Sequence, residues 1–176
     1  MEIRTATQQD WESINRVYYS AFPKDECELV AKLAVDLLAE NTTPQTISLI
    51  AEVDNALVGH VAFSPAGIEG FDRGQAYILA PLAVDIDHQK NGIGSSLVNQ
   101  GIKRLSAVGV NILFVYGDPN YYAKFGFEID IARSFATPYK LEYPSGWQAM
   151  VLNSCSIPEE PVAISCVASL CDSRYW

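Results

Sequence analysis

The sequence has few of the side chains that hold metal ions. Its 176 residues include two histidines and four cysteines, and no two cysteines form a C-x-x-C pair. Since none of the usual ligand spacings occurs, we expect no metal site. We interpret the cysteines as free thiols in a reducing compartment. They are Cys27, Cys155, Cys166 and Cys171.

The sequence also lacks a basic excess and a long apolar run. The 21 acidic residues outnumber the 12 Lys and Arg, and the resulting net charge of −9 argues against binding of nucleic acid or anionic membranes. No apolar run is long enough to span a membrane, and the polar start MEIRTATQQD has no signal-peptide core. We therefore expect a cytoplasmic protein with neither a nucleic-acid nor a membrane partner. The charge would suit a cationic substrate, although most acidic proteins are simply soluble.

What is present is a globular composition with strand and helix patterns in alternation. With 49% hydrophobic and 19% charged residues, the chain should fold as one domain, with or without an appendage. Helical periodicity predicts helices between Asp10 and Pro23, before ENTTP, over residues 92–108 and, briefly, within DPNYYAKFGF. The predicted strands are EIRTA, TISLIAEV, ALVGHVAFSP, AYILAPLAV, NILFVYG, FEIDI and WQAMVL.

Turn residues refine this outline. Asp54-Asn55 predicts a hairpin between two strands, and GFDRGQ predicts a turn. Pro81 within AYILAPLAV marks an edge, a bulge or a break in strand pairing. The patterns do not place residues 153–176, which could cover the domain or pair with a neighbouring chain in a homodimer.

The loop from Val84 to Gly92 leads from a predicted strand into a predicted helix. A helix N-terminus leaves four N–H groups unpaired and carries roughly half a positive charge, which suits a phosphate. Glycine lets a phosphate approach these amides because it has no Cβ. Further donors and hydroxyls are available from Gln89, Lys90, Ser95 and Ser96.

The glycines alone could serve only the dihedral angles of a tight loop. The spacing Gln89-x-x-Gly92-x-Gly94, between a strand and an amphipathic helix, favours phosphate binding. Two nucleotide sites are less favoured. A P-loop would need G-x-x-x-x-G-K-[ST], which is absent, and a dinucleotide fingerprint would need a small residue where Leu97 stands.

Two motifs together resemble the GNAT superfamily of N-acetyltransferases. Its acyl-CoA pyrophosphate signature, Q/R-x-x-G-x-G/A, matches QKNGIG at residues 89–94. Members often carry Tyr-x-x-x-Gly-Phe after the next strand, and here Tyr122, Gly126 and Phe127 fit. The longer run GDPNYYAKFGF resembles one subgroup of largely uncharacterised acetyltransferases. The order of predicted elements matches the family from residue 1 to residue 152.

The resemblance implies an α/β (α+β) fold with a central mixed, mostly antiparallel sheet, splayed open beside Val84 and flanked by helices on both faces. It implies a GNAT domain over residues 1–152, followed by an extension at 153–176. Pantetheine would lie in the split, and the pyrophosphate would lie on the amides from Asn91 to Ser96. The cofactor-binding residues implied are Leu82, Ala83, Val84, Gln89, Lys90, Asn91, Gly92, Ile93, Gly94, Ser95 and Ser96.

The reaction implied is direct transfer of an acetyl group from acetyl-CoA, as co-substrate, to a small-molecule or peptide amine. Tyr122 matches the family position that protonates the leaving sulfur, although a packing role is the alternative. The segment FPKDECELVAKL would form the acceptor wall. No cysteine lies in a motif, so we expect no acetyl-cysteine intermediate. The general base stays open among a water relay, Glu28, Glu52, His60 and Asp118.

Two other classes of function stay open. One is a non-catalytic module that binds acyl-CoA but turns over no amine. The other is a nucleotide-binding protein of a different fold, which would prefer ATP or NAD to CoA.

Overall fold

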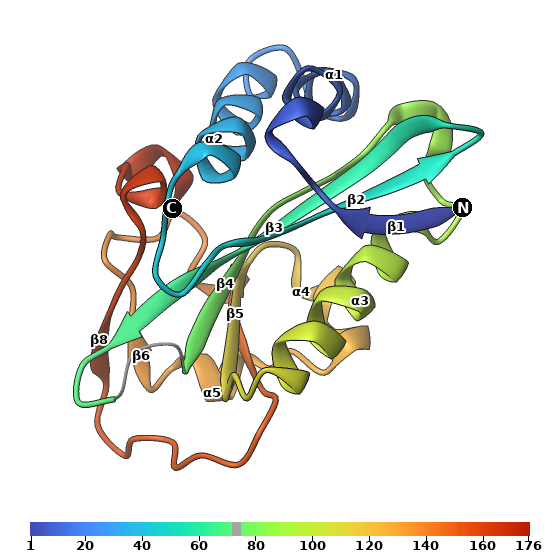
Figure 1. The fold of residues 1–176 in the computed structure, drawn as a ribbon. Coiled ribbons are helices and arrows are strands. Elements are labelled where there is room, and N and C mark those ends of the chain that lie inside the picture. The colour runs from blue at the N-terminus through green and yellow to red at the C-terminus, as the bar shows by residue number, and fades with distance from the viewer. Residues whose placement is uncertain (72–74) are drawn as a thin grey trace.

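The computed structural model describes residues 1–71 and 75–176 and is built on an open sheet (Figure 1). Neighbouring strands in the main sheet run antiparallel except β4 and β5, which are parallel. This confirms the mixed, mostly antiparallel sheet that the family resemblance implied. The strands lie in the order β1 (Glu2–Thr5), β2 (Ile47–Val53), β3 (Ala56–Ile68), β4 (Ala76–Val84), β5 (Ile112–Tyr116) and β7 (Trp147–Val151).

Helices cover both faces of the sheet, as expected. α1 (Trp11–Ala21) and α2 (Cys27–Ala39) lie on one face, and α3 (Ile93–Ala107) lies on the other (Figure 1). All three match helices that the apolar periodicity predicted. Two single-turn helices, α4 (Pro119–Tyr122) and α5 (Ile129–Ala132), follow β5.

The alternation of side chains along the strands creates a hydrophobic core on each face. The core under α3 contains residues such as Val61, Phe63, Leu79, Leu97 and Leu113. On the opposite face, α1 packs on Ile50 and Leu57, while α2 joins a cluster around Ile78, Phe114 and Trp147.

Two local predictions are confirmed by the backbone. Asp54 and Asn55 both have positive φ angles, 50° and 63°, as a two-residue hairpin turn of this kind requires. Opposite β3, the register of β4 shifts between Leu82 and Leu79, so Pro81 lies at a bulge. The turn expected at GFDRGQ lies partly outside the described residues.

The strand predicted at FEIDI is wrong. Glu128 makes a single bridge to Ala149, and the chain then turns into α5. Five residues are too few to separate a period of two from one turn of helix. In the structure, the helical turn places Ala132 in the core.

The segment that sequence patterns could not place packs against its own chain. β8 (Val162–Ser165) pairs with the end of β3 and with β6 (Phe135–Ala136). The chain then passes beside α2 and ends near it, at the point marked C in Figure 1. Leu170 and Trp176 are buried in the core below α2, so this tail covers the sheet. The domain division at residue 152 stays a prediction.

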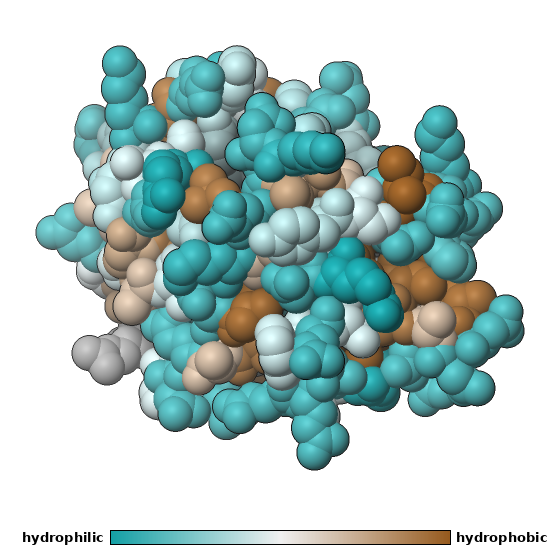
Figure 2. Space-filling view, turned by 90° about the horizontal axis from the view of Figure 1, so that it is seen from above, coloured by the Kyte–Doolittle hydropathy of each residue, from teal (hydrophilic) through white to brown (hydrophobic). Residues whose placement is uncertain are grey.

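The surface on the side of α1 and α2 is mainly hydrophilic, with some hydrophobic residues exposed between polar ones (Figure 2). Among the described residues, no helix combines the length and apolarity needed to cross a bilayer. The same part of the chain gathers no group of three or more His, Cys, Asp or Glu side chains suited to a metal ion.

Helix α3 is held against the sheet by a close approach at Gly101. A Cβ added there would lie 1.9 Å from Cζ of Phe63, whose ring is fully buried in β3. We expect Gly101→Ala to destabilise the protein by about 1–3 kcal/mol through overpacking, against a gain of about 1 kcal/mol in helix propensity. Urea unfolding of Gly101→Ala and its parent measures the difference.

A double-mutant cycle supplies the control, because Phe63→Ala removes the ring that a side chain at position 101 would strike. In the Phe63→Ala background, Gly101→Ala should become neutral or stabilising. An equal cost in both backgrounds would show that the ring does not set the helix position.

Candidate active site

Strands β4 and β5 separate toward their C-terminal ends. They pair from Ala76↔Ile112 to Leu79↔Val115, and no pairing between them follows in the described chain. β4 continues to Val84 while still paired with β3. The side of residues 80–84 that faces away from β3 therefore offers main-chain groups to a ligand. This is the split that the family resemblance implied.

Two hollows meet at this split. The first, which we call the large cleft, has a volume of about 780 Å³ and lies between α2, β4, residues 140–143 and residues 170–176. The second, the loop hollow, has a volume of about 510 Å³ and lies between the end of β4, residues 88–95 and α4. Leu82 lines both. A long, flexible molecule could therefore lie across β4 and reach into each.

The loop that opens α3 is shaped by its own residues. Lys90 and Gly92 have positive φ angles, 62° and 79°, and nothing lies within 4 Å of a Cβ built at Gly92. The side-chain amide of Gln89 donates to the carbonyl of Val84 at 3.1 Å, which braces the loop against the strand. An open, glycine-capped helix N-terminus with a lysine beside it is suited to an anion.

The predicted cofactor residues do not all face this hollow. Ile93 lines it but is only 4% exposed, so its side chain belongs mainly to the core. The amide of Ser96 already donates to the carbonyl of Gly92 at 2.9 Å, and neither Asn91 nor Ser96 lines the hollow. The predicted residues that line it are Leu82, Ala83, Val84, Gln89, Lys90, Gly92, Ile93, Gly94 and Ser95.

Three residues that line the loop hollow were not among the predicted cofactor-binding residues, namely His88, Tyr121 and Lys124. Tyr121 lies over Gly94, because a Cβ there would be 2.8 Å from its hydroxyl oxygen. Lys124 places its ammonium 4.0 Å from the centre of the Tyr121 ring and adds a second cation to the hollow. For Tyr121 and Lys124 the signal was present in the sequence, since both lie within the motif run YYAKFGF.

Tyr122 lines the large cleft instead of the loop hollow. Its ring packs edge-on against Tyr121 and Phe127, and the residue is only 9% exposed. Burial, followed by the proximity of Tyr121, raises the pKa of the Tyr122 phenol well above its usual value of 10. The hydroxyl therefore keeps its proton at neutral pH.

Comparisons with known proteins decide the family. The model of the "Acetyltransferase (GNAT) family" matches residues 9–127. The chain belongs to the GNAT acetyltransferase family. This confirms the family and the enzyme class, an acyltransferase, that the two sequence motifs indicated.

Relatives of this GNAT chain are similar over most of its length. The "Uncharacterized N-acetyltransferase YjhQ" of Escherichia coli is 33% identical over 149 residues, which cover 77% of this chain and 82% of the relative. The crystal structure of the Escherichia coli GNAT protein YhbS with CoA has a TM-score of 0.81 at 27% identity and covers 96% of this chain and 90% of that one. A GNAT acetyltransferase from Brucella melitensis with acetyl-CoA has a TM-score of 0.73 at 25% identity, with 96% of both chains covered.

The four side chains considered as general base in this GNAT chain lie in different surroundings. His60 is fully buried between the hydroxyls of Tyr18 and Ser48, each 2.8 Å from one ring nitrogen. Glu52 is paired with Arg4 at 2.8 Å on the outer part of the sheet. Glu28 is exposed and does not line the large cleft. Asp118 does line it, although its carboxylate also accepts the Asn120 amide at 2.9 Å and caps α4.

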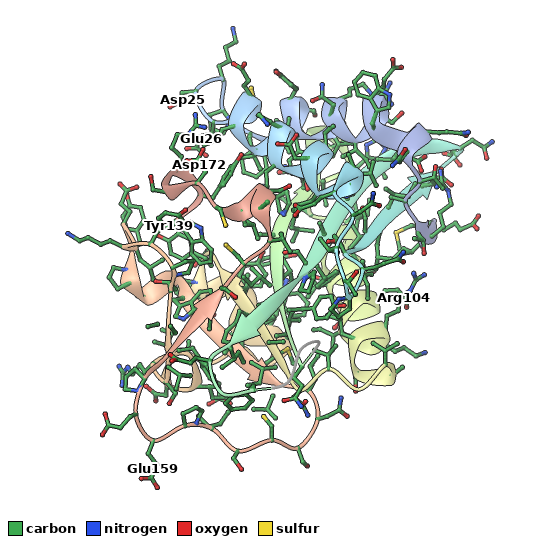
Figure 3. The ribbon with its side chains drawn as sticks, turned by 60° about the vertical axis from the view of Figure 1, so that its left-hand side comes forward. Asp25, Glu26, Arg104, Tyr139, Glu159 and Asp172 are labelled. Carbon is green, nitrogen blue, oxygen red and sulfur yellow. The ribbon has the colours of Figure 1, made fainter. Side chains whose placement is uncertain are left out.

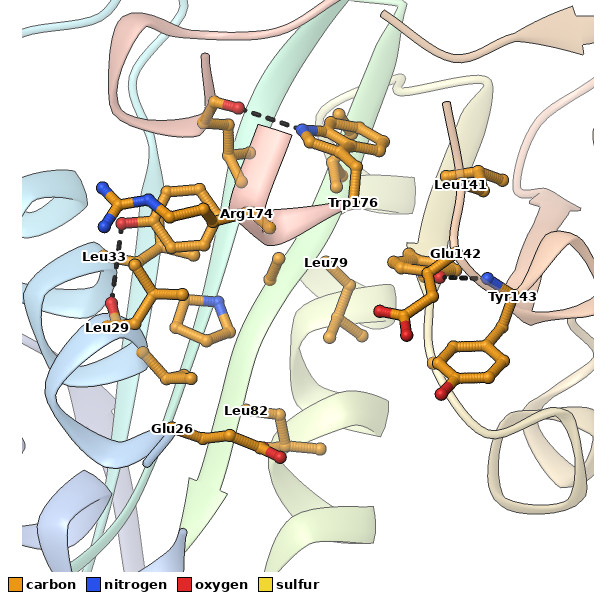
Figure 4. A pocket seen from close by; sticks show the side chains of 18 of the residues that line it. Glu26, Leu29, Leu33, Leu79, Leu82, Leu141, Glu142, Tyr143, Arg174 and Trp176 are labelled. Atoms are coloured by element: carbon orange, nitrogen blue, oxygen red, sulfur yellow. Dashed lines mark hydrogen bonds between the residues drawn. The ribbon is translucent and has the colours of Figure 1, made fainter. Parts of the chain in front are cut away.

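Two further carboxylates that the sequence analysis did not name individually line the large cleft. Glu26 precedes α2 and Glu142 follows β6, and both point into the cleft in Figure 4. Asp25, Glu26 and Asp172 are gathered at the same end of the molecule in Figure 3. Glu26 lies in the segment FPKDECELVAKL, which was expected to form the acceptor wall, whereas Glu142 comes from a distant part of the chain that no local pattern marked.

The buried His60 makes the stability of this GNAT protein depend on pH. Burial, opposed by the charge of Asp10, lowers the pKa of His60 from 6.5 to about 3. As the pH falls below 6.5, the unfolded chain therefore binds the proton first, and stability is lost progressively toward pH 3. The free energy of unfolding should fall by roughly 2 kcal/mol between pH 6.5 and pH 5, at about 1.4 kcal/mol per pH unit.

Urea titrations at pH 6.5 and pH 5 test this expectation. His60→Asn is the matched control, because the amide keeps hydrogen-bonding atoms but does not titrate. The variant should lose less stability than the parent across this interval. An equal loss in both proteins would assign the pH dependence to other groups.

Proposed function

We propose that this protein binds acetyl-CoA across the split between β4 and β5 and transfers its acetyl group directly to an amine. The observation that carries this proposal is the continuity of the two hollows at Leu82, beside the unpaired edge of β4. One hollow has cationic and amide donors suited to phosphate, and the other is a large, mainly apolar cleft with carboxylates. The CoA and acetyl-CoA complexes of YhbS and the Brucella melitensis protein support the same co-substrate here.

The residues present fit the parts of acetyl-CoA. The pyrophosphate would be held by the amides that open α3, with Lys90 and Lys124 supplying positive charge. Main-chain groups of Leu82 and Val84, which face away from β3, would hydrogen-bond the amide groups of pantetheine, whereas those of Ala83 face His60 in β3. Because Gly92 leaves open space where a Cβ would stand, a phosphate can approach its backbone.

With acetyl-CoA bound in the split, a backbone N–H near Val84 would polarise the acetyl carbonyl as negative charge develops on its oxygen. Tyr122, which lines the large cleft, would donate its proton to the sulfur as the bond to carbon breaks. Binding both reactants beside β4 supplies proximity. No described cysteine lines either hollow, which supports direct transfer without an acetyl-cysteine intermediate.

The acceptor, a small-molecule or peptide amine, would enter the large cleft. Its apolar wall includes Leu29, Leu33 and Leu141, and the carboxylates of Glu26 and Glu142 would attract an ammonium group. Of the four side chains considered as general base, Asp118 lines the cleft, which supports it as the group that would accept a proton from the amine, directly or through water. A cytoplasmic location and a homodimer remain parts of this proposal.

Two measurements in sequence test the function. Thermal unfolding with CoA, acetyl-CoA, longer acyl-CoAs, ATP and NAD should show stabilisation by acetyl-CoA and CoA in preference to the nucleotides. Release of free thiol from acetyl-CoA in the presence of a library of amines then identifies acceptors. Binding without turnover of any amine would favour a non-catalytic module, and preference for ATP or NAD would overturn the proposal.

Gly94→Val should weaken acetyl-CoA binding by about tenfold or more, equivalent to roughly 1.4 kcal/mol, because its side chain would project into the loop hollow. Isothermal titration calorimetry measures the affinity, and thermal unfolding confirms that the variant is folded. Because the new side chain also meets Tyr121, the double variant Gly94→Val/Tyr121→Ala is the control. Its affinity should remain low. Unchanged affinity in a folded Gly94→Val variant would remove the phosphate role of this loop.

Tyr122→Phe should reduce kcat by about 10²-fold or more, since general acid help is typically worth ~10²–10⁴ in rate. The ring and its packing remain, so acetyl-CoA affinity should change little. Steady-state kinetics on an identified acceptor provide the measurement, with Tyr121→Phe as the neighbouring control and the milder of the two changes. If Tyr121→Phe causes the larger loss, or Tyr122→Phe none, the proton donor has been assigned to the wrong residue.

A further inference from the structure

Two cysteines lie together in the tail that covers the sheet. Cys166 and Cys171 stand on either side of the turn η5 (Ala168–Leu170), and their sulfur atoms are 3.6 Å apart. Both are free thiols, and Cys171 is exposed while Cys166 is partly buried. A disulfide has an S–S distance of about 2.05 Å, so the sulfurs need to approach by only roughly 1.5 Å to form one.

The turn between the two thiols is fixed to α2. Past the end of α2, the Glu40 carboxylate accepts the amides of Ala168 and Ser169, each at 3.0 Å. These contacts hold the backbone of η5 in place, so the thiols face each other without a large rearrangement of the chain. An approach that is already made in the folded protein raises the effective concentration of one thiol for the other.

The same turn leads directly into the wall of the large cleft. The carbonyl of Leu170 accepts the indole N–H of Trp176 at 3.0 Å, and both residues line the cleft. Tyr175, another wall residue, donates its hydroxyl to the carbonyl of Leu29 in α2 at 3.5 Å. Figure 4 shows these two hydrogen bonds on the same side of the cleft. A bond across η5 would therefore constrain the first part of this wall.

We propose that Cys166 and Cys171 form a reversible disulfide in the folded protein, which locks the tail that builds one wall of the large cleft. The oxidant is a low-molecular-weight disulfide of the glutathione class. The Cys171 thiolate attacks one sulfur of the oxidant, forms a mixed disulfide and releases one thiolate. The Cys166 sulfur then attacks the sulfur of Cys171 and releases the second. Two protein thiols lose two electrons and two protons, and the oxidant becomes two thiols.

The surroundings of the two thiols decide the order of these steps. Cys171 is the more accessible to an oxidant. Burial, together with the hydrogen bond and charge of the neighbouring Cys171, raises the pKa of Cys166 to about 12. Cys166 is therefore the less reactive thiol at first. Once Cys171 is joined to the oxidant, its sulfur stays next to that of Cys166, and this proximity makes Cys166 the resolving thiol.

Intact-mass measurement after incubation with oxidised glutathione tests the bond without any acetylation assay. The parent should lose about 2 Da, two hydrogen atoms, regain them with dithiothreitol, and give a linked Cys166–Cys171 peptide. Cys166→Ser and Cys171→Ser should instead retain one glutathione or none. Cys27→Ser and Cys155→Ser, which leave the pair intact, should lose the same mass as the parent.

The contribution of the folded turn is measured by repeating the titration in urea. The equilibrium constant against glutathione should be at least about tenfold higher in the folded protein. Stable glutathione adducts on Cys166 or Cys171 of the parent, disulfide-linked dimers through either residue, or a bond from either residue to Cys155 would overturn the proposal. An equal constant in urea would also overturn it, because proximity along the chain would then explain the bond.

Amide hydrogen exchange tests the lock separately from the bond. In the oxidised protein, exchange at the hydrogen-bonded amides of Cys171, Tyr175 and Trp176 should slow by about tenfold relative to the reduced protein. If the disulfide forms but exchange at these amides is unchanged, the proposal that it locks the tail is wrong. We also expect the disulfide to change the KM of an identified acceptor while the affinity for acetyl-CoA stays constant. This expectation alone rests on the proposed acetyltransferase function.

Discussion

The loss of pairing between β4 and β5 beyond Leu79 is the constraint on which the rest of the structure depends. Residues of both strands keep the split open. On β4, Pro81 has no N–H to offer a neighbouring strand and lies at the bulge opposite β3. On the other side, the Gly117 amide that follows β5 donates to Gly146 at 2.9 Å, and Gln148 donates to the Gly117 carbonyl at 3.2 Å. β5 thus turns toward β7, and the freed groups of β4 need an outside partner.

A sheet that opens in this way needs support on both faces. On the face that carries α3, Gly101 leaves room for the Phe63 ring, so the helix can lie close to the sheet. On the opposite face, α1 is joined to the sheet by the buried network of hydroxyl and imidazole groups from Tyr18 through His60 to Ser48. Both ring nitrogens of His60 have a hydrogen-bond partner in this network. The network therefore orients helix and sheet without leaving an unpaired donor on the ring.

Sequence patterns predicted the elements whose formation is local. The hairpin at Asp54-Asn55, the three long helices and the glycine loop depend on residues close together in the chain, and all were found. The tail and the acidic residues of the cleft depend on contacts between distant segments, such as Glu40 with Ser169, and carry no periodic signal. The strand prediction at FEIDI was wrong for a different reason, because its alternation was too short to exclude a helical turn.

The pair Tyr121 and Tyr122 shows how one short element can serve both hollows. Successive residues of a helix point about 100° apart, so adjacent side chains on α4 leave it in different directions. Tyr121 lies over Gly94 in the loop hollow, while Tyr122 lines the large cleft. The direction of both rings is fixed by where α4 begins, and Asp118 fixes that point by capping it. The separation of β5 from β4 and the cap that immediately follows β5 together determine which tyrosine faces which hollow.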